Sequence, residues 1–458
     1  QILIDDLYTL KKTIVDSHPN PYAFISKEDF HKGFTQAIES IDSTTTLGDY
    51  TLIVANVLNM MKDSHTGIEY GHLQKMQTEH GKGFVPIRLH SVNGALYVSL
   101  DRDSILPKGS QILCWNNIEI TKLYVESTKY ANIEGSAVTG QRRIADAIFP
   151  FVVGLKHPMP DTVSIDFQRF GSDSIETAYY PVMKKGAWDQ RQKMLSKTEF
   201  ERQQSLSFYR HDTLAVLKVG TFAPGDANRY RKFILKAFEE INKRNVQVLV
   251  LDIRDNSGGQ SSNVEFLYSF LKKEGHNTPS NIIAKSSKLA KDRSKHLQKG
   301  FTRFMLRTFF KKDEDIQGFL RWSGLPEGTL DTVYFSNKVT QKSDLVFEGK
   351  CVLLINGLTA SAGVDFTHTF LAEKRGEIIG EPCLGPMTGT FGNPAAFKLP
   401  NTKIGVTIAT IRYNYDNTFE YDPLPIKPTI QVDILPENLA NGKDVCLQYV
   451  LSHLEELK

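Results

Sequence analysis

The sequence has few cysteines, no long apolar run and almost no net charge, and each of these absences excludes something. The four cysteines are scattered and form no CxxC pair, which argues against a disulfide framework and against a zinc site. No apolar run reaches the roughly 18 residues that a bilayer span requires. A formal net charge of +3 gives no global signal for nucleic acid or membrane partners. The redox compartment stays undecided, and neither a metal nor another cofactor is expected.

The first residues show an amphipathic helical pattern instead of a signal peptide. Leu3, Leu7, Leu10 and Ile14 recur at helical spacing, and Pro19 follows the end of that pattern. Any targeting segment would therefore precede the numbered chain. The composition, 40% hydrophobic and 23% charged, is typical of a soluble globular protein, and the length of 458 residues suggests about three domains.

The hydrophobic pattern changes twice along the chain, which predicts the domain boundaries. A helical period dominates the first part, and Ser26 is expected to cap its second helix. Short alternating strands follow, and the remainder alternates strands with helices in the manner of a parallel sheet. The predicted domains are a helical domain at 1–75, a mostly β module at 76–188 and an α/β domain at 189–458.

A basic stretch interrupts the α/β part. Between Lys285 and Lys312 there are ten Lys or Arg residues and one acid, Asp292, with phenylalanines interleaved. Two interpretations are open. A solvated insertion over the core is favoured, because charged runs usually form solvated faces. A basic amphipathic helix for a membrane surface or an acidic partner is the alternative.

Ser361 is the first candidate for chemistry because of its position. Residues 351–355 are five consecutive apolar residues, which predict a short buried strand, and a helical pattern opens at Ser361 itself. A serine on a sharp strand-to-helix turn presents its hydroxyl outside the sheet, next to backbone N–H groups that can hold an oxyanion. The alternative is that Ser361 only caps the helix.

A second strand-to-helix turn carries the pair Gly258 and Gly259. If its strand neighbours the strand before Ser361, these two amides and the Ala362 amide can form an oxyanion hole. Taken alone, the glycine pair indicates no more than a tight turn. The two turns gain significance only together.

A serine nucleophile needs a base within hydrogen-bond reach. His368 shares the predicted helix with Ser361, but seven residues along a helix span about 10 Å, which is too far. His18 and His65 both follow an Asp-Ser pair. His18 stands at a helix end before a proline, whereas His65 lies in a compact polar turn, so His65 is preferred and His18 remains a rival.

The motifs around these residues resemble those of the carboxy-terminal-processing (tail-specific) serine peptidases. Residues 252–259 carry an Asp-x-Arg-x-Asn-x-Gly-Gly turn, and residues 359–363, Thr-Ala-Ser-Ala-Gly, resemble the nucleophile motif of that family. Both occur in the expected order, each after a strand and before a helix. The resemblance implies an α/β fold with a crotonase-like peptidase core, an N-terminal helical region and a PDZ-like β module.

The family has two catalytic arrangements, and the sequence favours one. The Ser–Lys branch needs a lysine about two dozen residues after the serine, but no lysine lies between Lys374 and Lys398. The tricorn-like branch uses an earlier Ser-His pair and a late glutamate. Ser64-His65 resembles that pair and Glu420 the glutamate, which implies that His65 is the base and that Ser64 and Glu420 orient it.

The same resemblance implies the substrate and the location. The likeness to a PDZ module rests on residues 108–113 and on Gly81, Gly83 and Phe84 before a strand, and these last three are the expected substrate-binding residues. The β module is therefore expected to receive a peptide or an unfolded protein by strand addition. An exported enzyme, periplasmic or in the cell envelope, is expected. Two alternatives stay open: a Ser–Lys peptidase that uses Lys374 or Lys398, and an inactive peptide-binding scaffold.

Overall fold

The structure, a computed structural model, divides into two compact units that draw on distant parts of the sequence. Unit 1 comprises Gln1–Leu73, Asn277–Ser336 and Thr388–Pro423, and unit 2 comprises Gln74–His276, Asn337–Met387 and Leu424–Lys458. These units are not the three domains inferred from the sequence, and that division stays a prediction. The structure describes residues 1–69, 83–157, 159–196, 198–209, 213–272, 279–295, 300–309, 314–334, 345–416 and 419–457.

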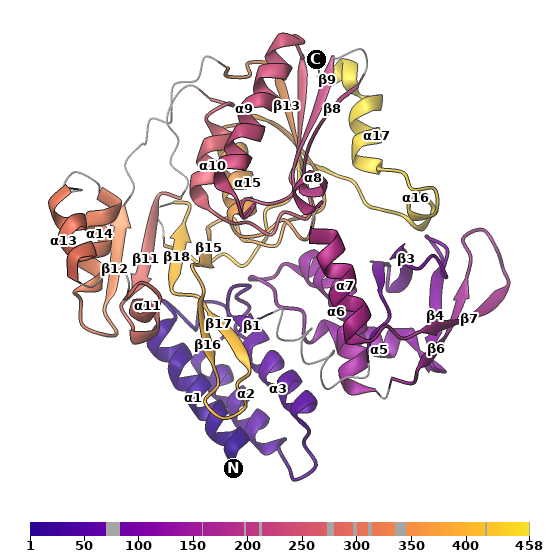
Figure 1. Cartoon of the computed structure of the whole chain (residues 1–458), viewed down its shortest axis with the longest axis horizontal. Coiled ribbons are helices and arrows are strands. Elements are labelled where there is room, and N and C mark those ends of the chain that lie inside the picture. The colour runs from indigo at the N-terminus through magenta and orange to yellow at the C-terminus, as the bar shows by residue number, and fades with distance from the viewer. Residues whose placement is uncertain are drawn as a thin grey trace. The chain divides into compact units, whose positions relative to one another are not determined.

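Unit 1 begins with the predicted helices, α1 (Ile2–Ser17), α2 (Lys27–Glu39) and α3 (Leu47–Asn59). The side chain of Ser26 accepts the Asp29 amide at 3.0 Å, so its predicted capping role is confirmed. The apolar faces of the three helices pack on a small sheet (Figure 1). In order, its strands are β1 (Gly67–Ile68), β17 (Gly405–Ile408) and β16 (Ala395–Lys398).

A second sheet completes unit 1. In order, its strands are β12 (Leu330–Tyr334), β11 (Asn281–Lys285), β18 (Ile411–Asn414) and β15 (Gly389–Gly392). The helices between β11 and β12 are α11 (Lys288–Arg293), α13 (Gly300–Phe309) and α14 (Glu314–Ser323). Cations of the basic stretch bond within the unit: Lys285 donates to the Val15 carbonyl and Lys291 to the Leu325 carbonyl, each at 2.6 Å. These two bonds favour the interpretation of the stretch as an insertion over the core.

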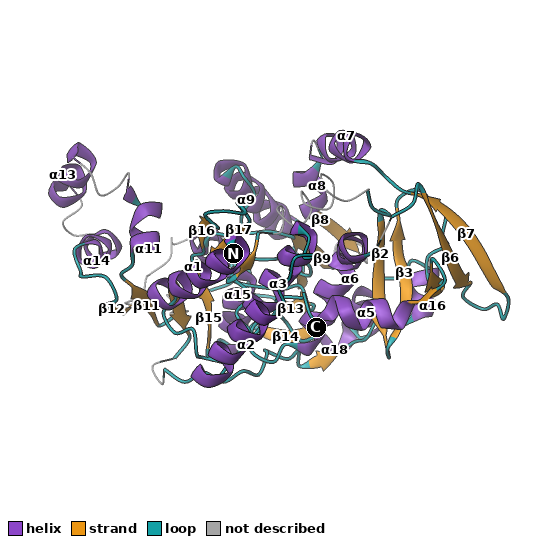
Figure 2. Ribbon diagram, turned by 90° about the horizontal axis from the view of Figure 1, so that it is seen from below, coloured by secondary structure: helices purple, strands orange, loops and turns teal. Residues whose placement is uncertain are grey.

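The first part of unit 2 is a twisted antiparallel sheet with two helices against it (Figure 2). In order, its strands are β2 (Ile87–Val92), β3 (Ala95–Asp101), β4 (Gln111–Trp115), β6 (Thr162–Gln168) and β7 (Ile175–Pro181), and β5 (Ile118–Glu119) pairs with β4. The helices are α5 (Ile120–Thr128) and α6 (Val138–Lys156). Asn93 and Gly94, both at positive φ, form the turn between β2 and β3. Helices α7 (Lys185–Ser196) and α8 (Glu199–Gln203) follow β7.

The second part of unit 2 is the α/β core. In order, its strands are β19 (Ile430–Gln431), β14 (Gly376–Gly380), β13 (Lys350–Ile355), β10 (Val248–Asp252), β9 (Leu214–Val219) and β8 (Gln204–Tyr209). All neighbours pair in parallel except β8 with β9. The parallel sheet predicted from the alternation of strands and helices is therefore confirmed.

Helices cover both faces of this sheet, which explains why its central strands are almost entirely apolar (Figure 1). One face carries α9 (Ala227–Lys243), α10 (Ser261–Tyr268) and α15 (Ala362–Ala372). The other packs on α17 (Val445–Ser452) and α18 (Leu454–Leu457), after α16 (Pro436–Ala440). Among the described residues of both units, no helix has the length and apolar composition to cross a membrane.

His90 gives the β module a testable acid sensitivity. The side chain is 7% exposed on β2, and burial, together with Arg143 and Arg88, lowers its pKa from 6.5 to about 3. A depressed pKa means that the unfolded chain binds the proton first, so the stabilisation is complete above pH 6.5 and is lost as the pH falls toward 3.

We expect the unfolding free energy to fall by about 2 kcal/mol more in the wild type than in His90→Phe between pH 7 and pH 5, because only the wild type carries this titration. Urea unfolding at the two pH values measures the difference. Equal falls in both proteins would show that His90 does not carry the effect.

Candidate functional site

Ser361 lies where the chain leaves β13 and enters α15. Its φ is +52°, in the left-handed region that a non-glycine residue adopts only when the surrounding structure enforces it. The side chain makes no capping hydrogen bond to the helix. The alternative that Ser361 serves only as a side-chain cap is therefore wrong, and the strained turn points to another use of the hydroxyl.

The turn after β10 is built around Asn256, which is fully buried. Asn256 Oδ1 accepts the Gly258 amide at 2.8 Å, and Nδ2 donates to the Val219 carbonyl at 2.8 Å. Its own carbonyl accepts the Ala360 amide at 2.9 Å, which joins this turn to the one before Ser361. One side chain and its backbone thus fix both turns in a place that water does not reach.

The two turns meet directly at Gly258. Its φ is +101°, and a Cβ on it would lie 2.6 Å from Ser361 Cβ and 2.8 Å from the Ala362 nitrogen. Only glycine allows both the dihedral angle and the approach. β10 and β13 are parallel neighbours, so the condition that the sequence left open is met and the two turns lie side by side.

The three predicted oxyanion donors differ in how their hydrogens are used. The Gly258 amide donates within its own turn. Gly259 forms a parallel bridge with Phe222, in which the Phe222 amide donates to the Gly258 carbonyl and the Phe222 carbonyl accepts from the Gln260 amide. The amide of Gly259 itself therefore points away from Phe222. The Ala362 amide is the first of α15 and has no acceptor among the described residues. Gly259 and Ala362 are thus better placed as donors to a ligand than Gly258.

Within unit 2, the elements next to Ser361 bring no evident base to it. His368 lies seven residues along α15, about 10 Å away at 1.5 Å per residue. Lys374 lies beyond the end of that helix and is exposed. Lys398 belongs to unit 1, where it is exposed at the end of β16. The Ser–Lys alternative therefore stays open.

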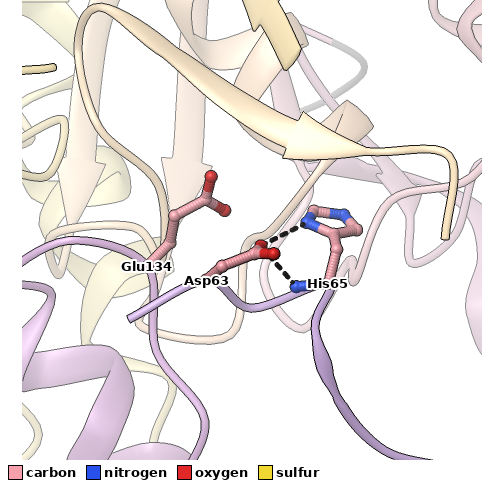
Figure 3. A group of neighbouring side chains, drawn as sticks. All are labelled: Asp63, His65 and Glu134. Atoms are coloured by element: carbon pink, nitrogen blue, oxygen red, sulfur yellow. Dashed lines mark hydrogen bonds and ion pairs between the residues drawn. The ribbon is translucent and has the colours of Figure 1, made fainter. Parts of the chain in front are cut away.

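His65 lies in unit 1, in the turn between α3 and β1. Figure 3 shows its ring and its backbone nitrogen next to the Asp63 carboxylate. Asp63 Oδ1 accepts the His65 amide at 2.9 Å and lies 3.8 Å from His65 Nδ1. The hydroxyl of Ser64 is 3.2 Å from the same Nδ1. The side chain of His65 is 12% exposed. The turn therefore directs one ring nitrogen toward polar partners of its own.

His18, the rival candidate, proves to be the support of this turn. Its Nδ1 accepts the Asn20 amide at 3.1 Å, so the neutral ring carries its proton on Nε2, which donates to Asp63 Oδ2 at 2.9 Å. His18 and Asp63 are each 1% exposed. Burial alone would raise the pKa of Asp63, but His18 and His65 outweigh it and hold that pKa below its usual value. Asp63 is thus a buried carboxylate that sequence reasoning missed as a site residue.

Glu420 lies in the same unit as His65 and is exposed. Its backbone carbonyl accepts a hydrogen bond from Nη2 of the buried Arg412 at 3.3 Å. The neighbouring Tyr421 stacks on Phe391 at 6.2 Å, and Phe391 contacts the His18 ring at 4.5 Å. The segment of Glu420 is thus connected through two rings to the support of the His65 turn.

Phe84, one of the three predicted substrate-binding residues, packs and pairs within the β module. Gly81 lies outside the described residues, and Gly83 has a φ of +106°. Phe84 is 2% exposed, packs on Trp188 at 4.5 Å and forms both backbone hydrogen bonds of a bridge with Met183. Its backbone is therefore already paired, and a substrate contact at Gly83 or Phe84 stays a prediction.

Arg254, the arginine of the turn motif, is also structural. Its guanidinium bonds Asp252 at 2.8 and 2.7 Å and Asp444 at 2.8 and 2.7 Å. Burial disfavours its charge, but the two carboxylates raise its pKa well above the usual value. Asp444 in turn caps α17. This pair spans 190 residues of sequence, so no local pattern could have indicated it.

Part of the chain, including Ser361 and both glycines of the turn motif, matches the sequence model of a known family. The sequence model of peptidase family S41 matches residues 213–432. No curated protein matches the chain. Among solved structures, mature CPAF complexed with lactacystin is 13% identical with a TM-score of 0.68, covering 98% of this chain and 97% of that one. Mature CPAF is 14% identical with a TM-score of 0.68, covering 99% of this chain and 97% of that one. The photosystem II D1 C-terminal processing protease is 13% identical with a TM-score of 0.44, covering 95% of this chain and 94% of that one. The two CPAF structures share this fold.

Proposed function

We propose, from the premise that this chain belongs to peptidase family S41 and is a serine peptidase, that Ser361 is its nucleophile and His65 its general base. The observation that carries the proposal is the strained Ser361 turn, which Gly258 approaches so closely that no side chain fits between them. A strained nucleophile beside oriented amides is the arrangement that acyl transfer needs.

The chemistry follows from the groups at the two turns. Ser361 Oγ attacks the scissile carbonyl carbon while His65 accepts the hydroxyl proton. The Gly259 and Ala362 amides stabilise the resulting oxyanion, and each such donor typically contributes about 10²–10³ in rate. Collapse expels the amine, which takes the proton from His65 and leaves an acyl-enzyme. Water, activated by His65, then releases the acid.

The orientation of His65 supports its role as the base. With the ring proton on Nδ1, the Ser64 hydroxyl accepts it at 3.2 Å, and the Nε2 lone pair becomes the basic site. Ser64 is therefore proposed to orient the ring, as the family resemblance implies. Asp63 adds to this by fixing the backbone of His65 and by placing a negative charge near Nδ1.

Glu420 is proposed as the late acid that polarises His65. What supports it is the Tyr421–Phe391–His18 contact chain, which ties its segment to the support of the histidine turn. Asp63 is the competing candidate, because it is buried and already bonds the turn. Equal activity of Glu420→Gln and wild type, with loss in Asp63→Asn, would transfer the role to Asp63.

We also propose that the core is crotonase-like and that the module spanning β2 to β7 is PDZ-like. The order of the module sheet leaves β2 at one edge, next to α6, where a peptide or an unfolded protein C-terminus can add as a strand. Export to a periplasmic or cell-envelope location rests on the family resemblance alone.

Labelling with a fluorophosphonate probe tests the proposed function. The probe is expected to form one covalent adduct, which peptide mapping places on Ser361, while His65→Ala loses most of the labelling and Ser64→Ala retains part of it. Peptide binding without any adduct on Ser361 would favour an inactive scaffold. Labelling that survives in His65→Ala but is lost in Lys398→Ala would favour the Ser–Lys alternative.

A further inference from the structure

A buried ion network in unit 2 ends at the turn that presents Ser361. Arg143, on α6, donates from Nη1 to Asp146 Oδ2 at 2.9 Å and from Nε to both oxygens of Glu381 at 3.1 Å. The three side chains are only 13%, 2% and 6% exposed. Glu381 follows β14, so the network joins the β module to the α/β core within one unit.

The carboxylate of Glu381 has a second partner in the nucleophile turn. Its Oε2 accepts the Gly357 amide at 3.3 Å, and Gly357 lies between β13 and Ser361. A Cβ on Gly357 would lie 2.9 Å from Arg143 Cγ and 3.0 Å from the Thr139 carbonyl. The first turns of α6 thus pack against the backbone of this turn.

Stability alone does not account for such a network. Two carboxylates and one guanidinium lose most of their hydration here, and apolar residues of similar size often stabilise a fold as well as a buried ion network does. A network of this kind gives directional contacts that an apolar cluster lacks. Here the directional contact is made with the Gly357 amide, four residues before Ser361.

We propose that Arg143 and Glu381 are positioning residues for the reaction, holding the 356–360 turn so that Ser361 and the Ala362 amide keep their mutual geometry. The inference rests on the proposed role of Ser361. Neither side chain is assigned a contact with the substrate. A displacement of about 1 Å at a reacting group can cost on the order of 100-fold in rate, so loss of the network should lower kcat more than it raises KM.

The experiment compares variants of the network with a variant of another partly buried arginine, Arg375. Arg143→Met and Glu381→Ala are expected to lower kcat for peptide cleavage, and the rate of fluorophosphonate labelling, by about 10- to 100-fold with KM within about twofold. Glu381→Gln keeps an acceptor for the Gly357 amide and should recover most of kcat. Arg375 donates to the carbonyls of Leu271, Phe347 and Gly349, before β13 begins, so Arg375→Met should lose stability and keep kcat.

Two outcomes would overturn the inference. One is that Arg143→Met loses no more kcat than Arg375→Met at a comparable melting temperature. The other is that Glu381→Gln is as impaired as Glu381→Ala. If Arg143→Met does not fold, Arg143→Lys and Glu381→Asp keep the charges and change only the geometry, and full activity in both would refute positioning. Absence of labelling on Ser361 in the wild type would instead refute the proposed function.

Discussion

Replacing Ser361 with alanine is expected to lower kcat for peptide cleavage by about 10⁴- to 10⁶-fold while leaving peptide binding and the melting temperature nearly unchanged. The hydroxyl makes no capping bond to α15, so its removal costs the fold little, and alanine still has to occupy the same strained φ. His65→Ala should lose kcat to a similar degree, because the serine without a base is a weak nucleophile.

The combination of the two changes is the sharper measurement. If Ser361 and His65 act together in one step, the double variant should be no slower than Ser361→Ala alone, because His65 has no catalytic role once the nucleophile is absent. His368→Ala is the matched control: it lies on α15 but about 10 Å from Ser361, and it should retain kcat. Multiplicative losses in the double variant would mean that His65 acts elsewhere.

Local pattern was enough to predict the elements that build the nucleophile side. Five consecutive apolar residues at 351–355 gave β13, and the helical pattern after Ser361 gave α15. The alternation of strands and helices predicted a parallel sheet, but only the structure shows that β10 and β13 are neighbours in it. The predicted features depend on neighbouring residues and on burial of a continuous strand, which a single sequence displays directly.

Contacts between distant residues could not be predicted in this way. His18 and His65 were rivals in the sequence, yet Asp63 bonds both, and its bond to His18 spans 45 positions. The Arg143–Glu381 pair spans 238 positions. No period or motif encodes such a pairing, because it depends on how whole elements pack. The same reason hid the grouping of residues 277–336 and 388–423 with the N-terminal helices.

The backbone pairing of Phe84 could not be predicted from the motif that contains it. The Gly-x-Gly-Phe pattern suggested a loop that receives a substrate, but the Phe84 amide and carbonyl both bond Met183, and the ring is buried. A segment that follows β7 supplies this partner, and the local sequence gives no sign of it. The edge strand β2 is also partly bonded, since the Ser91 amide donates to Asp146 and the Ser91 carbonyl accepts from Arg143, so the place of strand addition stays a prediction.

Gly258→Ala is the second large effect that we expect, with a loss of at least about 100-fold in kcat. The added methyl group would lie 2.6 Å from Ser361 Cβ and 2.8 Å from the Ala362 nitrogen, so both turns must move apart. That movement disturbs the nucleophile and an oxyanion donor together, and loss of one such donor alone typically costs about 10²–10³.

Gly225→Ala separates this steric effect from backbone strain. Gly225 has a φ of +77°, so alanine at this position also destabilises the fold through the left-handed conformation, but its Cβ would meet no atom within 4 Å. Both variants should therefore lose about 1 kcal/mol or more of unfolding free energy, measured in urea, while only Gly258→Ala loses kcat. Equal activity of the two variants would mean that the approach of Gly258 to Ser361 has no part in catalysis. A selective loss in Gly258→Ala would tie the glycine pair of the turn motif to the geometry of the nucleophile.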